Sequence, residues 1–155
     1  MNYVLTSEYD FASAHYLNGH QGKCKNLHGH NYLVRIEVGA NELQKEGSSR
    51  EMVIDFYDIK QEFRKLLDSL VHSTHIENHK YSEPTHEYID IKIGDIVVEK
   101  SHVVWLPFRP TAENYAKFIY EHLTNKGFPV HAITVYETPI NACRYCPQEK
   151  LTTCY

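Results

Sequence analysis

The feature that most constrains this chain is a short run near its amino terminus, from Cys24 to Tyr32, which places a thiol four residues before a His-Gly-His triplet. If residues 28–38 form a strand, side-chain alternation points His28 and His30 to the same face as the apolar residues that follow them. An imidazole on an apolar face needs a partner for each ring nitrogen, and a bound metal supplies one. The pattern therefore indicates a zinc site, with a polar turn beside a structural cysteine as the alternative.

A third histidine has the same inward parity. Residues 3–17 are typical of a strand, in which His15 shares a face with the apolar Phe11. The histidines His15, His28 and His30 then match the three protein ligands of a catalytic zinc, whose fourth position is open to water or substrate. Cys24 is an alternative ligand that would close a structural site, because thiolate binds zinc strongly. Spacing alone leaves both kinds of site open.

The composition is that of one compact domain with a small ligand. The chain has 155 residues, 42% of them hydrophobic, which is enough for a core of its own. Its 16 basic and 20 acidic residues give a formal net charge of -4 with no long run of either sign, so no nucleic-acid or anionic-membrane footprint is indicated. The amino-terminal residues lack a signal segment, and no apolar stretch has membrane-spanning length. We therefore expect a cytoplasmic protein.

The remaining cysteines lie close to the carboxyl terminus. Without an export signal, thiol or metal roles are favoured over disulfides. Cys143 and Cys146 form a Cys-x2-Cys pair, and Cys154 follows. No second pair or nearby histidine comes after them, so structural thiols are favoured over a second zinc site or a redox pair.

The periodicity predicts two helices and four main strands. One helix begins after Asp55 as N-cap and runs to about Leu70, and a second begins after Thr111 and ends at Gly127. The strands are expected at residues 3–17, 30–40, 130–138 and 142–145. This element order predicts an α+β domain, with a four-stranded antiparallel sheet that carries both helices on one face.

Residues 79–108 are interpreted as an insertion within this single domain, 1–155. Alternating isoleucines on either side of Gly94-Asp95 predict an extra β-hairpin, and Trp105 is a candidate to anchor it. Four histidines lie in or near this segment and are assigned to solvent or interface roles, because no pair has metal-ligand spacing. They are His75, His79, His86 and His102.

Four further motifs accompany the His-Gly-His run in a fixed order. They are Phe11-Ala12-Ser13-Ala14-His15, Val53-Ile54-Asp55-Phe56, Pro110-Thr111-Ala112-Glu113-Asn114 and Val135-Tyr136-Glu137-Thr138. Together with the step from Cys24 to His28, this series resembles the 6-pyruvoyl-tetrahydropterin synthase and 6-carboxy-tetrahydropterin synthase family over nearly the whole chain. The four-residue step is more similar to the 6-carboxy branch than to the animal 6-pyruvoyl branch, where it is longer. The resemblance implies the tunnelling fold and a homo-oligomer, a hexamer, with active sites between subunits.

The resemblance also implies a catalytic pair, Cys24 and His72. Counting from Asp55 without a gap brings His72 onto the family's catalytic histidine. The family usually has Asp-His at this point, whereas this chain has Val71-His72. The carboxylate that would orient the imidazole is therefore absent, and from its position alone His72 reads as a solvated histidine past a helix end.

Glu137 shares strand parity with Ile133 and Val135, so its carboxylate ends an apolar row and needs hydrogen-bond donors. A salt bridge to a surface Lys or Arg is one interpretation. The resemblance implies another, in which Glu137 accepts two parallel hydrogen bonds from the 2-amino group and ring N–H of a pterin. Thr111 is implied on the same basis as a second pterin contact.

The resemblance thus predicts a zinc-dependent lyase acting on 7,8-dihydroneopterin triphosphate. The 6-carboxy branch forms 6-carboxy-5,6,7,8-tetrahydropterin, acetaldehyde and triphosphate, and its product feeds 7-deazaguanine (queuosine-type) synthesis. The nearer alternative is 6-pyruvoyl-tetrahydropterin synthase activity, which eliminates triphosphate and keeps the carbon chain. The other is a zinc-containing pterin-binding protein without turnover, because Val71 stands in place of the usual aspartate.

Overall fold

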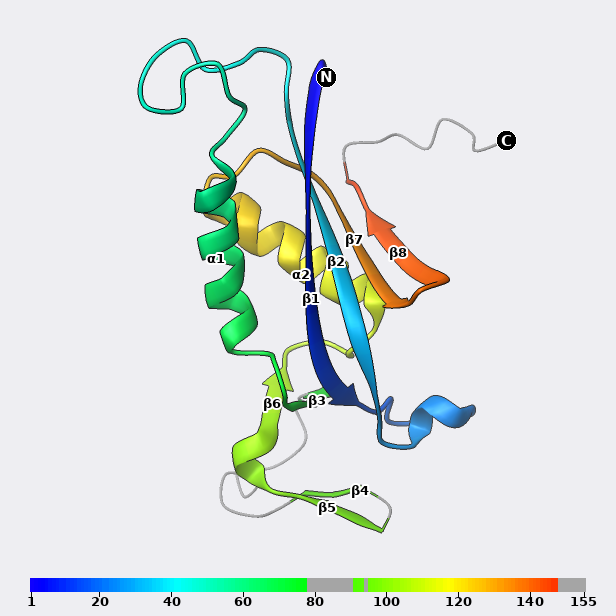
Figure 1. The fold of residues 1–155 in the computed structure, drawn as a ribbon. Coiled ribbons are helices and arrows are strands. Elements are labelled where there is room, and N and C mark those ends of the chain that lie inside the picture. The colour runs from blue at the N-terminus through cyan, green and yellow to red at the C-terminus, as the bar shows by residue number, and fades with distance from the viewer. Residues whose placement is uncertain (78–90, 94, 148–155) are drawn as a thin grey trace, which may run out of the picture.

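Two long strands form the centre of the structure, a computed structural model that describes residues 1–77, 91–93 and 95–147 (Figure 1). β1 (Tyr3–His15) and β2 (His28–Ala40) pair antiparallel along their whole lengths. Alternate residues of each strand face the protein interior, which is the pattern of a sheet covered on one side. The register pairs His15 with His28, so the predicted metal ligands come together at one end of the hairpin.

The sheet has six strands in the order β6-β3-β1-β2-β7-β8. β7 (Val130–Thr138) and β8 (Asn141–Tyr145) continue the antiparallel pairing beyond β2. On the other side, β3 (Thr74–Glu77) pairs parallel with β1, and β6 (Val103–Leu106) pairs parallel with β3. The prediction of a four-stranded, purely antiparallel sheet is therefore wrong in this detail. The two added strands have four residues each, too few to show a clear period in the sequence.

Both helices begin at the predicted caps. α1 (Phe56–Asp68) starts after Asp55, whose side chain accepts a hydrogen bond from the amide of Tyr57. α2 (Ala112–Asn125) starts after Thr111 and is followed by Gly127 at a φ of 88°. α1 ends slightly before the predicted end at Leu70.

The two helices share one core with the inward face of the sheet. Its largest fully buried side chains come from both helices and from β2 and β7, and include Tyr32, Ile36, Phe63, Tyr115, Ile119 and Ile133. This arrangement, with both helices against one face, agrees with the prediction. Among the described residues, no helix has the length and apolar character needed to cross a membrane.

The predicted hairpin is formed by β4 (Ile91–Ile93) and β5 (Ile96–Val98), with Ile93 paired to Ile96. It lies at the end of the molecule where β1 ends and β2 begins (Figure 1). Ile93 and Val98 pack with Ile76, and Trp105 packs against this cluster, as predicted. Residues 79–90 of the predicted insertion, with His79 and His86, lie outside the described residues.

Candidate metal centre

Three histidines converge at the end of the β1–β2 hairpin. Each of His15, His28 and His30 offers one ring nitrogen, and the three atoms lie within 4.8 Å of one another. His15 Nε2 and His28 Nε2 are 3.1 Å apart. Two nitrogens of a tetrahedral zinc site, each about 2.0–2.1 Å from the metal, stand at roughly this separation. Among the described residues this is the one such group, and Cys24 is not part of it.

Backbone carbonyls fix which nitrogen of two rings faces the cluster. His15 Nδ1 is 2.7 Å from the carbonyl oxygen of Pro110, and His28 Nδ1 is 2.8 Å from that of Asn26. Because a carbonyl only accepts, Nδ1 carries the proton in both rings and Nε2 is left with a free lone pair. This is the usual arrangement of metal-binding histidines, whose other nitrogen donates to an outer acceptor.

The third ring carries the observation that best tests whether a metal fits. His30 Nε2 is buried and has no hydrogen-bond partner. A buried ring nitrogen without a partner is costly, and a metal held with His15 and His28 would satisfy it. The donor set present therefore fits a divalent metal.

Burial favours the neutral form of His15 and His30, which is the form that a metal requires. Burial is the main reason that the pKa of His15 falls from 6.5 to about 4; the Pro110 carbonyl opposes this fall, and the neighbouring His28 and His30 add to it. Burial also lowers the pKa of His30, against the opposing effect of Glu137. His15 and His30 therefore hold few protons that a metal would have to displace near neutral pH.

Acid should destabilise the metal-free protein. An unfolded His15 takes up a proton as the pH falls below about 6.5, whereas the folded ring resists protonation until about pH 4. The free energy of unfolding should therefore fall across this window, by roughly 3 kcal/mol at most. Urea denaturation of chelator-treated protein measures this. His15→Asn keeps an N–H for Pro110 but cannot titrate. If the free energy of unfolding depends on pH equally in this variant and in the unsubstituted protein, His15 is not the group responsible.

Glu137 lies beside the cluster, at the end of β7. Its Oε1 is 3.6 Å from His30 Nε2, and 29% of its side chain is exposed. The carboxylate also contributes, after burial, to the raised pKa values of Tyr32 and Tyr115. The partly open carboxylate is thus available to a ligand that reaches the three histidines.

Comparison with known proteins identifies the family. Residues 4–148 match the family described as 6-pyruvoyl tetrahydropterin synthase. The chain belongs to this family. It is 34% identical over 145 residues to a Haemophilus influenzae protein named 6-carboxy-5,6,7,8-tetrahydropterin synthase, with 92% of this chain and 98% of that protein covered. A Synechocystis protein of the same name is 33% identical over 144 residues, with 92% of each covered.

Solved structures confirm the tetrahydropterin synthase fold. An uncharacterized protein from Wolinella succinogenes superposes with a TM-score of 0.72 at 22% identity, over 94% of this chain and 98% of that one. A variant of Plasmodium vivax 6-pyruvoyltetrahydropterin synthase gives a TM-score of 0.64 at 21% identity, over 92% and 96%. The family resemblance drawn from the sequence motifs is therefore confirmed, and with it a tetrahydropterin synthase type of enzyme.

Two other predicted site residues, Cys24 and Thr111, lie in segments next to the cluster histidines or their supports in the chain. Cys24 is a half-buried free thiol in a short 3-10 helix, Lys23–Lys25, within the loop that joins two of the histidines. Burial raises the pKa of Tyr32, and the interactions of Tyr32 with Glu137 and Cys24 raise it further, so Cys24 lies near the site. Thr111 caps α2 next to Pro110, and its Oγ1 accepts a hydrogen bond of 3.4 Å from the amide of Asn114. Thr111, which caps α2, thus directly follows Pro110, whose carbonyl accepts the hydrogen bond from His15.

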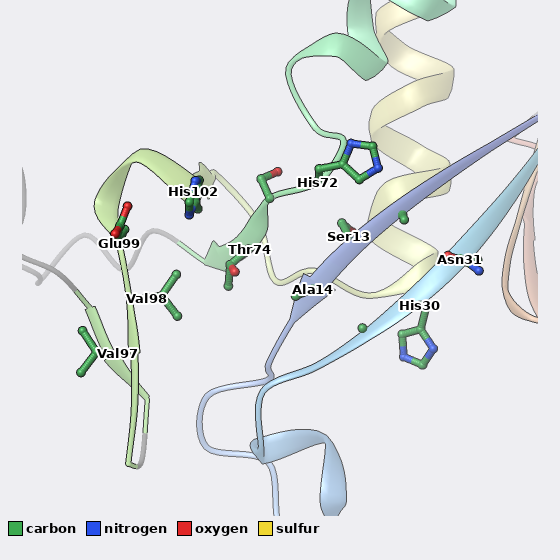
Figure 2. A pocket seen from close by; sticks show the side chains of 13 residues that line it. Ser13, Ala14, His30, Asn31, His72, Thr74, Val97, Val98, Glu99 and His102 are labelled. Carbon is green, nitrogen blue, oxygen red and sulfur yellow. The ribbon is translucent and has the colours of Figure 1, made fainter.

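His72 is not part of the histidine cluster of its own chain. It is exposed and lines a pocket of about 800 Å³, which His30 also borders, together with Ala12, Ala14 and Asn31. These three residues alternate with the cluster histidines along β1 and β2, so their side chains point to the opposite face of the sheet. Figure 2 shows the rings of His72 and His30 on opposite sides of the two strands.

His75 corrects one assignment. It was expected in a solvent or interface role, but it is fully buried in β3. Its Nδ1 lies against the hydroxyl of Tyr115, and its Nε2 is 2.8 Å from the carbonyl oxygen of Leu70. The error came from missing β3, which turns this side chain toward the core. His102 is exposed, in agreement with its expected role.

The Cys-x2-Cys pair consists of free, half-buried thiols. Cys146 Sγ lies 3.2 Å from the carbonyl oxygen of His131 and donates to it. Burial raises the pKa of Cys143, which disfavours the thiolate needed for metal binding or redox chemistry. Both observations agree with the structural interpretation, and Cys154 lies outside the described residues.

Proposed function

We propose that this chain is a zinc-dependent 6-carboxy-5,6,7,8-tetrahydropterin synthase that acts on 7,8-dihydroneopterin triphosphate. The observation that carries the proposal is the cluster of His15, His28 and His30. Two of its Nε2 atoms are freed by backbone carbonyls, the third makes no hydrogen bond within the described residues, and the Glu137 carboxylate lies beside it. The names of the relatives and the Cys24–His28 spacing support the 6-carboxy branch.

Zinc suits the site because three imidazole nitrogens leave a fourth position for substrate. When bound, zinc would supply a Lewis acid that lowers the pKa of a side-chain hydroxyl of the substrate. The protein's part is to orient the rings, which the carbonyls of Pro110 and Asn26 do for two of them.

Glu137 is proposed to orient the pterin. Its carboxylate would accept the 2-amino and ring N–H groups side by side, which fixes the ring so that its side chain reaches the three histidines. The short separation of Glu137 from His30 supports this arrangement. Thr111, at the adjacent α2 cap, is proposed as a second contact.

Cys24 and His72 are proposed as the proton-transfer pair. Cys24 lies in the loop between β1 and β2, whereas the rings of His72 and His30 lie on opposite sides of these two strands (Figure 2). A site that needs both groups is complete only when a second subunit brings its His72 to the cluster. The outermost strands β6 and β8 offer edges for such assembly, and we propose a homo-oligomer, a hexamer, with sites between subunits. Light scattering should find at least a trimer, and a fully active dilute monomer would refute the shared site.

The proposed products are 6-carboxy-5,6,7,8-tetrahydropterin, acetaldehyde and triphosphate, made in the cytoplasm for 7-deazaguanine synthesis. Incubation of the purified protein with 7,8-dihydroneopterin triphosphate, followed by mass analysis, tests this. A product that keeps the whole carbon chain would instead support 6-pyruvoyl-tetrahydropterin synthase activity, which fits the family description and the Plasmodium likeness. Binding without any product would support a non-catalytic pterin-binding protein.

Val71→Asp should move the pH dependence of turnover. A carboxylate beside His72 would stabilise its protonated form, so the limb of the pH–rate profile that reports His72 should shift to higher pH. Val71 is half-buried and packs against the core, so the variant should also lose about 1–2 kcal/mol of unfolding free energy. Val71→Asn is the matched control, because it costs similar packing without adding a charge. Equal profiles for the two variants would contradict the assignment of that limb.

A further inference from the structure

A buried histidine outside the metal centre connects three elements of the fold. The ring of His75 in β3 contacts the hydroxyl of Tyr115 in α2 and the carbonyl of Leu70, just beyond α1. None of the His75 or Tyr115 surface is exposed, and 3% of Leu70 is. Because the Leu70 carbonyl can only accept, Nε2 of His75 carries the proton, and Nδ1 accepts from the Tyr115 hydroxyl. Both nitrogens are therefore satisfied in one fixed tautomer.

The carbonyl that His75 contacts belongs to Leu70, the first residue of the turn that contains His72. The Leu70 oxygen also accepts a hydrogen bond of 2.6 Å from Ser73 Oγ. His72 itself has a φ of 53°, and its amide donates to the carbonyl of Ala12 at 2.8 Å. A residue other than glycine keeps such a left-handed backbone only where its surroundings fix it. Two sets of hydrogen bonds hold the backbone here: those to the Leu70 carbonyl, and the one from the His72 amide to β1.

We infer that His75 is a positioning residue, whose ring holds the Leu70 carbonyl and thereby sets where the Leu70–Ser73 turn presents His72. This rests on the proposed proton-transfer role of His72. The usual aspartate beside that histidine is replaced by Val71, which packs against the core and offers no hydrogen bond to the imidazole. His75 thus positions the backbone of the turn, whereas an aspartate at position 71 would orient the His72 imidazole directly.

Two neutral variants separate the contact with Leu70 from burial of a polar side chain. His75→Gln places an amide N–H where Nε2 was, so it keeps a donor for the Leu70 carbonyl. His75→Asn places its amide where Nδ1 was, so it meets Tyr115 and leaves Leu70 without this donor. Tyr115→Phe is a third variant that keeps the aromatic packing and only frees the tautomer of His75, so it should act in the same direction as His75→Asn but more weakly.

Hydrogen–deuterium exchange of the peptide that contains His72 reads its placement without reference to activity. We expect exchange at the His72 amide to be about tenfold faster in His75→Asn than in wild type, and near wild type in His75→Gln. We expect kcat in His75→Asn to fall roughly 10- to 100-fold with KM and zinc content unchanged. In a His72→Ala background, His75→Asn should have no further effect on kcat.

Equal exchange and equal kcat in the Asn and Gln variants would overturn the inference. So would a full loss of kcat from His75→Asn in the His72→Ala background, because His75 would then act through another group. A third outcome is faster exchange at the His72 amide in His75→Asn with kcat unchanged in both His75→Asn and His72→Ala. It would support the placement of His72 by His75 and refute the proton-transfer role proposed for His72. The two failures are therefore distinguishable.

Discussion

Replacement of both His28 and His30 by alanine is expected to abolish zinc binding, leaving less than about a tenth of a zinc per chain. One remaining histidine cannot form a three-ligand site, and the variant also removes His30, whose buried Nε2 makes no hydrogen bond to any described residue. Elemental analysis of protein purified without added metal measures the effect. Turnover should be lost in parallel, because the proposed reaction needs the metal.

The matched control for this variant removes two histidines outside the cluster. His102 is exposed, and His122 lies on α2 with its Nε2 3.1 Å from Glu62 Oε1. The His102→Ala, His122→Ala double variant should keep its full zinc content. Full zinc in a folded His28→Ala, His30→Ala variant would refute the ligand assignment.

Substitution of either member of the proposed proton-transfer pair should lower turnover without removing the metal. His72→Ala and Cys24→Ala are each expected to reduce kcat about 100-fold or more, as found when a general acid or base is lost. Zinc content should stay full, because neither side chain belongs to the histidine cluster. Steady-state kinetics and elemental analysis on the same preparations test both statements. His122→Ala should keep its kcat.

The position of His72 across the sheet gives this prediction a second test. A His72→Ala chain keeps its metal ligands, and a His28→Ala, His30→Ala chain keeps His72. If sites form between subunits, unfolding and refolding a mixture of the two inactive variants should restore part of the activity, because some sites combine intact groups from both chains. No recovery in mixed oligomers would show that His72 does not act in a neighbour's site.

Strand alternation was enough to predict that three histidines come together. His15, His28 and His30 share parity with buried neighbours, and long antiparallel strands bring such residues together wherever the register pairs them. The helix caps at Asp55 and Thr111 were equally local signals, since each side chain bonds to an amide two or three residues away. Such features depend on short stretches of chain.

The missed features depend on long-range contacts. Thr74, His75 and Ile76 of β3 are all buried, so this strand has no alternation to detect. His75 finds one partner 40 residues away, in α2, and its burial cannot be read from its immediate neighbours. In the same way, the face to which His72 turns depends on the φ of 53° and on its bond to β1. Neither has a signature in the sequence.

Zinc titration of the stripped enzyme tests the proposed function most directly. Chelator-treated protein is mixed with 7,8-dihydroneopterin triphosphate, zinc is added stepwise, and acetaldehyde and 6-carboxy-5,6,7,8-tetrahydropterin are measured by mass spectrometry. We predict no product without zinc and equal amounts of the two products with it, rising until about one zinc is bound per chain. Full turnover in the stripped protein, or a product that keeps the whole carbon chain, would contradict a zinc-dependent 6-carboxy-tetrahydropterin synthase.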